Sequence, residues 1–146
     1  MAAMTQFRET LAMMLTTTMK AQGPVAAIEV CSASAPQLAV QAGQAGLVIG
    51  RATNRPRNQA NAATGWRVDA LAALAASPRP ARFERVLDDG RLAIALPLEI
   101  QAPCLTCHGT AIQPEVASTL AARYPADKAT GYALGELRGV LWAEVE

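Results

Sequence analysis

The stretch that most constrains this chain is Cys104-Leu105-Thr106-Cys107-His108, a Cys-x-x-Cys-His sequence. This spacing is the attachment signal for c-type haem. Two thiols three positions apart can each form a thioether with one of the two vinyl groups on the porphyrin edge, and the next side chain then lies beneath the iron. His108 is the only histidine in the chain. The sequence therefore predicts one covalent haem c, attached at Cys104 and Cys107, with His108 as the proximal iron ligand.

Three other interpretations of these residues stay open. Cys31, Cys104, Cys107 and His108 would together make a Cys₃His zinc set, and Cys-x-x-Cys also occurs as a redox dithiol. Structural zinc sites commonly use two short ligand pairs, whereas Cys31 stands alone far upstream. A redox dithiol usually begins a helix after a strand in a βαβ unit, and little here suggests one. Chance occurrence is the third alternative, and the motif favours haem over all of them.

The composition is that of one folded domain, which we expect to span residues 1–146. Hydrophobic residues make up 51% of the chain and charged residues only 17%, so disorder is not expected. The formal net charge of +1 argues against a nucleic-acid binder. Aromatic residues are scarce at 4%. A bound porphyrin would supply the bulky apolar surface that the side chains lack.

The location of the protein follows from its expected cofactor. No uninterrupted apolar run approaches the roughly 20 residues that span a bilayer, and residues 1–20 lack the basic start and apolar block of a signal peptide. Covalent c-type haem is ordinarily attached outside the cytoplasm. We therefore expect a periplasmic protein whose leader or anchor has been removed, with membrane attachment only through a segment absent from this chain.

Apolar spacing predicts helices first and then a mostly antiparallel sheet, an α+β fold. Residues 1–22 are expected to form an amphipathic helix that Gly23-Pro24 breaks. Further helices are expected over 24–32, 37–42, 65–76 (ended by Ser77-Pro78-Arg79-Pro80) and 114–124, with Ser34-Ala35-Pro36 separating the first two. Strands are expected over 47–53, 82–87, 91–100 and 138–145.

The clearest β signal is a hairpin. Residues 82–87 and 91–100 flank the turn Asp88-Asp89-Gly90. Large apolar residues alternate strictly along the second strand, which predicts that one of its faces is buried; they are Leu92, Ile94, Leu96, Leu98 and Ile100. The haem motif is expected in a loop directly after this strand. In the last strand, Val140 and Trp142 should share one face.

Cys31 is left over once Cys104 and Cys107 are in thioether bonds. It is either a small buried apolar side chain or the sixth, distal ligand of the iron. The other candidates for that position are the five methionines (all at or before Met19), Lys20, Lys128 and water. Cys31 is favoured, because the methionines mostly fit the apolar stripe of the first helix. A thiolate stabilises ferric over ferrous iron, and reduction would then weaken the Fe–S bond.

Three arginines surround a turn-rich loop. Arg51, Arg55 and Arg57 could give charge-assisted hydrogen bonds to the haem propionates. A solvated basic loop is the equal alternative, so the propionate contacts are a hypothesis.

Together these residues resemble a known family, the small single-haem, PAS-like c-type domains first described in a cyanobacterial haem protein. The resemblance covers most of the chain. Its strongest points besides the haem motif are Gly23 to Cys31, Ile49-Gly50-Arg51 with Arg55-Pro56-Arg57-Asn58, and Gly131-Tyr132 with Gly135-Glu136-Leu137-Arg138-Gly139. One departure is Asn58-Gln59-Ala60-Asn61, where a proline is expected after the first asparagine.

The resemblance implies a PAS-like antiparallel sheet with flanking helices, ligation of the iron by His108 and Cys31, and a role in redox or gas sensing. A diatomic gas such as CO or NO would bind at the ferrous haem. A mono-haem electron-transfer cytochrome with a redox partner protein is the alternative. Catalysis is not expected, because no second histidine is available for acid–base work. Relatives are often joined to membrane helices or signalling modules, and a homo-oligomer is compatible with this picture.

Overall fold

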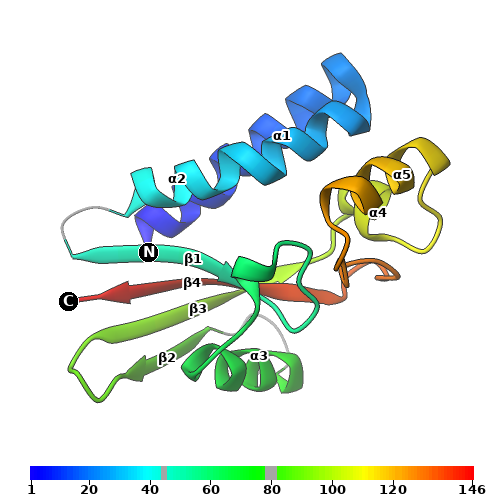
Figure 1. Cartoon of the computed structure of the whole chain (residues 1–146). Coiled ribbons are helices and arrows are strands. Elements are labelled where there is room, and N and C mark those ends of the chain that lie inside the picture. The colour runs from blue at the N-terminus through cyan, green and yellow to red at the C-terminus, as the bar shows by residue number, and fades with distance from the viewer. Residues whose placement is uncertain (44–45, 78–81) are drawn as a thin grey trace.

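The computed structural model describes residues 1–43, 46–77 and 82–146, and it has the expected α+β architecture (Figure 1). A four-stranded antiparallel sheet has the order β1-β4-β3-β2. Its strands are β1 Leu47–Ala52, β2 Phe83–Val86, β3 Leu92–Glu99 and β4 Leu137–Val145. The antiparallel sheet is confirmed, and its description as PAS-like stays a prediction.

The helices lie on both faces of this sheet. The long N-terminal segments cover one face and α3 the other, while α4 and α5 lie beyond the ends of the central strands (Figure 1). The bounds are α1 Ala2–Glu29, the π-helix η1 Val30–Ser34, α2 Ala35–Ala42, the 3₁₀ turn η2 Gln59–Asn61, α3 Trp66–Ala76, the 3₁₀ turn η3 Ala102–Cys104, α4 Leu105–His108 and α5 Pro114–Arg123. The predicted stop at Ser77-Pro78-Arg79-Pro80 lies mostly outside the described residues. Within the described ranges, no helix has both the length and the apolar character needed to cross a membrane.

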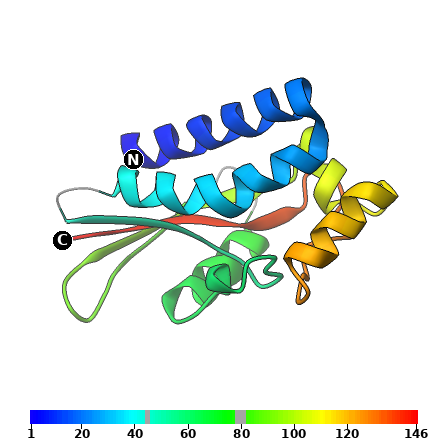
Figure 2. The same ribbon diagram turned by 45° about the horizontal axis from the view of Figure 1, so that its top comes forward.

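The predicted break at Gly23-Pro24 is confirmed. Gly23 has φ 84° and ψ 174°, a left-handed conformation that glycine adopts at little cost, and Pro24 cannot donate a helical hydrogen bond. The chain reverses here, so residues 24–42 run back alongside residues 2–22 (Figure 2). We call this pair the helical hairpin, residues 2–42.

The second arm of the helical hairpin departs from the prediction. Ser34-Ala35-Pro36 does not separate two helices. Instead the helix continues through the π-helical turn η1, in which the Ala35 N–H donates to the carbonyl oxygen of Val30. Pro36 explains the wider turn, because its ring would clash with the carbonyl one helical turn earlier and it has no N–H to donate. Cys31 lies in this turn. Such turns are frequent at functional sites.

The sheet is buried on both faces, so the prediction of one buried face for β3 was incomplete. Ile94 packs with Met4 and Phe7 of α1, as the alternation predicts. Ala95 points the other way and packs with Leu71 and Leu74 of α3. The small alanine side chains on this face allow the helix to approach the strand closely. Val140 and Trp142 do share a face, the one that α3 covers.

Gly50 shows how closely this layer is packed. It lies opposite Trp142 in the β1–β4 register, and a Cβ at Gly50 would lie 2.4 Å from Cζ2 of that indole. Trp142 is itself held by an edge contact to Trp66, with ring centroids 6.2 Å apart, and by the guanidinium of Arg67 over its ring at 3.8 Å. The indole therefore has little freedom to move aside.

We expect Gly50→Ala to lower the free energy of unfolding by about 2 kcal/mol, because the added methyl group overpacks a fixed ring. Urea denaturation followed by tryptophan fluorescence measures this change. Val48→Ala, on the same strand but 52% exposed, is the control and should change stability by less than about 0.5 kcal/mol. Equal stabilities of the two variants would contradict the packing described here.

Candidate functional site

The Cys-x-x-Cys-His segment follows β3 directly, as predicted, but it is helical rather than a loop. Ala102–Cys104 form η3 and Leu105–His108 form the single turn α4. Pro103 explains this start, because its fixed φ is already suited to the first helical turn. The Gly109 N–H donates to the Leu105 carbonyl at 3.0 Å and closes the last turn.

A second segment, residues 127–132, is hydrogen-bonded to the backbone of the motif. The Tyr132 N–H donates to the His108 carbonyl, and the Gly131 N–H donates to the Gly109 carbonyl, both at 2.9 Å. Arg57 joins the two segments, since its Nη2 donates to the Cys107 carbonyl at 2.6 Å and its Nε to Oδ2 of Asp127 at 2.9 Å. The backbone on both sides of His108 is therefore fixed by hydrogen bonds from distant parts of the chain.

The imidazole of His108 has the tautomer and the protonation state that metal binding requires. Its Nδ1 lies 2.7 Å from the carbonyl oxygen of Ala129. A carbonyl only accepts, so Nδ1 carries the hydrogen and Nε2 keeps its lone pair. Burial, and then the positive charges of Arg57 and Arg138, lower the pKa of His108 to about 3. The imidazole is therefore neutral at physiological pH, the form that ligates metals.

Cys31 lies across a small cavity from this imidazole. The cavity has a volume of about 40 Å³ and lies between the helical hairpin and α4 and α5. Its lining includes Met19, Cys31, Arg57, Cys107, His108 and Tyr124. Cys104 is not among the lining residues and packs instead with Ile100, Ala129 and Tyr132. The fold thus brings Cys31 to the same place as Cys107 and His108, although the sequence separates them widely.

The Cys₃His zinc interpretation finds no support in this arrangement. Among the described residues, no group of three or more His, Cys, Asp or Glu side chains is arranged to hold a metal ion. Cys104 accepts a hydrogen bond from the Gln101 N–H at 3.4 Å, in the apolar cluster beside the cavity.

The electrostatic potential at Cys31 is positive, because three arginines act on it. Burial raises the pKa of the Cys31 thiol, while Arg51, then Arg57 and Arg138, act in the opposite direction. Burial also raises the pKa of the Cys107 thiol. Both groups are therefore neutral thiols, surrounded by cations that would favour the anion once a metal ion replaced the proton.

The three predicted arginines differ in their partners. Arg55 lies over the Tyr132 ring at 3.9 Å and donates to Glu136 at 3.2 Å. Arg57 forms an ion pair with Asp127 and donates a hydrogen bond to the Cys107 carbonyl, as described above. Within the described part of the chain, the Arg51 guanidinium has no hydrogen-bonded or ion-paired partner, and burial lowers its pKa. Of the three, Arg51 is the one whose charge is left for a bound anion.

Sequence reasoning missed several residues of this site. The Ala129 carbonyl and the Asp127 carboxylate give no sequence signal, because neither belongs to a motif. Arg138 donates to Thr53 Oγ1 at 3.0 Å and contributes to the positive potential at Cys31 and His108. Arg138 belongs to the Leu-Arg-Gly run that carries part of the resemblance, and the run by itself indicates no role for it.

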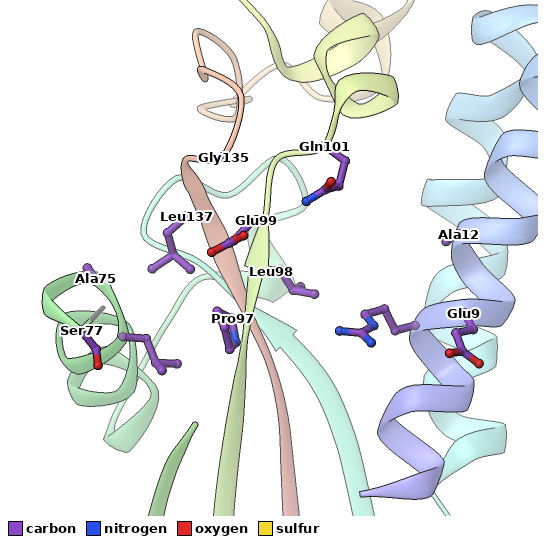
Figure 3. A pocket seen from close by; sticks show the side chains of 12 residues that line it. Glu9, Ala12, Ala75, Ser77, Pro97, Leu98, Glu99, Gln101, Gly135 and Leu137 are labelled. Carbon is purple, nitrogen blue, oxygen red and sulfur yellow. The ribbon is translucent and has the colours of Figure 1, made fainter. Parts of the chain in front are cut away.

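A larger groove of about 700 Å³ lies elsewhere, between α1 and the end of β3 (Figure 3). Leu98 and Glu99 lie at its centre, with Glu9 of α1 on one side and Ser77, after α3, on the other. Its lining holds no thiol and no imidazole. Pro97 lies where β3 extends beyond β2, and a strand edge that lacks an N–H is a poor site for adding another strand. The groove therefore lacks the residues that would bind a haem, and the cavity at His108 remains the candidate site.

Comparison with known proteins decides the family. The model of the Tll0287-like family matches residues 1–145. The chain belongs to this family.

One solved structure has the same fold as this Tll0287-like chain. It is described as the crystal structure of the cyanobacterial heme-protein Tll0287, with a TM-score of 0.74 and 22% sequence identity. The similarity covers 99% of this chain and 90% of that one. No curated protein matches.

The donor chemistry of this Tll0287-like chain fits a c-type haem. It offers a neutral imidazole with a free Nε2, two thiols at the attachment spacing, a third thiol opposite and an uncompensated guanidinium. The space is smaller than the ligand, because pockets that hold small organic ligands measure roughly 300–1,000 Å³ against about 40 Å³ here. The elements that line the cavity would therefore have to separate to admit a porphyrin.

Proposed function

We propose that this chain is a c-type haem protein, with one haem attached at Cys104 and Cys107 and with His108 and Cys31 as the axial ligands. The observation that carries the proposal is that Cys31, Cys107 and His108 line one cavity. Membership of a family with a heme-protein among its structures supports it. A bound haem supplies one-electron redox chemistry and, when ferrous, a site for diatomic gases.

Each residue has a defined part in this proposal. His108 binds the iron through Nε2, and the Ala129 carbonyl fixes its tautomer and raises its basicity. Arg57 holds the backbone of the attachment segment in place. Cys31 binds from the helical hairpin as a thiolate, whose charge favours ferric iron. Arg51 and Arg138 offset that negative charge in a partly buried setting.

We further propose that the domain is a redox or diatomic-gas sensor in the periplasm. Cys31 lies on the helical hairpin, so breaking its bond to the iron frees that arm to change position, which a partner or a neighbouring module could detect. An electron carrier is the alternative, with an unidentified redox partner. We propose no catalytic activity, because His108 is the only histidine and is already a ligand.

Absorption spectra of the purified ferric and ferrous protein, with and without CO, distinguish these functions. A sensor changes its ligation on reduction or binds CO without denaturation. A carrier keeps both axial ligands through the redox cycle and excludes CO. A protein with no Soret band after expression with haem-attachment machinery would reject both.

Removal of Arg51 tests the charge at the site. We expect Arg51→Gln to lower the reduction potential by several tens of millivolts, because loss of a cation that interacts with the iron ligands or propionates favours the ferric state, and such an interaction is worth roughly 1–2 kcal/mol at about 10 Å. A redox titration measures the shift. Arg8→Gln, on the exposed face of α1, is the control and should leave the potential unchanged. Identical potentials for all three proteins would remove Arg51 from the site.

A further inference from the structure

Met19 lines the same cavity as Cys31 and His108. Of the other methionines, Met4 is buried against the sheet, Met1 and Met13 are 53% and 63% exposed, and Met14 is not among the residues that line this cavity. Met19 lies on the first arm of the helical hairpin and Cys31 on the second, whereas His108 belongs to α4. The cavity therefore has two sulfur-bearing side chains on its hairpin side and one imidazole opposite them.

Helix geometry brings the side chains of Met19 and Cys31 towards the same level of the hairpin. Met19 precedes Gly23 by four positions and Cys31 follows it by eight, so their Cα atoms differ in height along the hairpin by roughly 6 Å at 1.5 Å per residue. Helical side chains lean towards the N-terminus of their own helix. In this antiparallel pair, Met19 therefore leans towards the level of Cys31, and Cys31 leans towards the level of Met19. The long, unbranched methionine side chain covers the remaining difference.

The two sulfurs prefer different oxidation states of iron. A thiolate carries a negative charge and stabilises ferric iron, whereas a neutral thioether paired with histidine favours the ferrous state. We propose that Met19 is the axial ligand that replaces Cys31 when the iron is reduced. The inference rests on the proposed function, in which His108 and Cys31 hold the ferric iron.

An external one-electron donor, such as dithionite in the test tube, reduces Fe(III) to Fe(II). Cys31 leaves with the electron pair of the broken Fe–S bond and takes up one proton from water. Met19 donates a sulfur lone pair to form the new bond, and no covalent bond of the side chain changes. The net process consumes one electron and one proton.

The test uses the full haem-loaded chain and Met19→Leu, which keeps the volume of the side chain without its sulfur. The ferric absorption spectrum should match that of the wild type. The ferrous spectrum should change from six-coordinate low-spin to five-coordinate high-spin, and CO should bind at least about tenfold faster because no internal ligand competes. Met13→Leu, an exposed methionine on the same helix, is the matched control and should behave as the wild type.

A second measurement needs no variant. In the diamagnetic ferrous wild type, a methionine bound to the iron shows its methyl proton resonance shifted far upfield by the porphyrin ring current, and this resonance should be present. Its absence, or a ferrous spectrum unchanged in Met19→Leu, overturns the inference. Failure of the proposed function looks different, because Cys31→Ala would then leave the ferric spectrum unchanged.

Discussion

Replacement of Cys31 by alanine is expected to raise the reduction potential by about 100 mV or more, and to abolish the low-spin thiolate spectrum of the ferric protein. Axial-ligand identity sets haem potentials over a range of about 0.8 V, and loss of an anionic sulfur removes the main stabilisation of the ferric state. The position of Cys31 across the cavity from His108 is the structural reason for this expectation. Covalent attachment should persist, because Cys104 and Cys107 are untouched.

Ferric and ferrous absorption, electron paramagnetic resonance and a redox titration measure these effects. Ser34→Ala is the neighbouring control, since Ser34 belongs to the same π-helical turn as Cys31 and does not line the cavity. An unchanged ferric spectrum in Cys31→Ala would return Cys31 to the apolar core, where free cysteines are common.

The second large effect concerns attachment. Acid–acetone extraction of the wild type should leave the haem on the protein, because thioether bonds survive denaturation. In the double variant Cys104→Ser with Cys107→Ser, all haem should pass into the organic phase. Each single variant should keep one thioether. Cys31→Ala is the control that removes a thiol outside the motif and should retain its haem.

Haem extracted from the wild type would contradict covalent attachment. Stoichiometric zinc without a Soret band would instead support the Cys₃His alternative. Electrospray mass spectrometry of the intact chain gives an independent result, because covalent haem adds its own mass to the polypeptide. The single variants then show whether Cys104, which packs outside the cavity, forms its thioether as readily as Cys107.

Local chemistry explains which parts of the fold were predictable. Gly23-Pro24 combines a residue that tolerates positive φ with one that lacks an N–H, so the helix break follows from two residues alone. The alternation along β3 likewise predicts a strand from its own residues. The π-helical turn at Cys31 was not predictable, because Pro36 can either end a helix or widen it. Packing of Ile28 against α5 favours continuation.

In the site, too, residues of a local motif were predictable and residues that depend on distant partners were not. The motif alone predicts the roles of Cys104, Cys107 and His108, since its spacing is itself the chemical requirement, and these roles stay predictions. The arginines were harder, because a guanidinium is available to a ligand only if no protein group has taken it. Asp127, which engages Arg57, lies far along the chain, and so does Glu136, which engages Arg55. Only the tertiary structure shows that Arg51 lacks such a partner among the described residues.

The helical hairpin also has a consequence for chain entropy. An iron bonded to both Cys31 and His108 would join residues roughly 80 positions apart and restrict the unfolded chain as a disulfide does, a constraint worth about 4.5 kcal/mol for a loop of that size. Loss of the Cys31 bond alone would reopen this loop and loosen the N-terminal arm. A ligand exchange to Met19, on the same hairpin, would keep the loop closed. The oxidation state of the iron would then alter the position of the hairpin without releasing it.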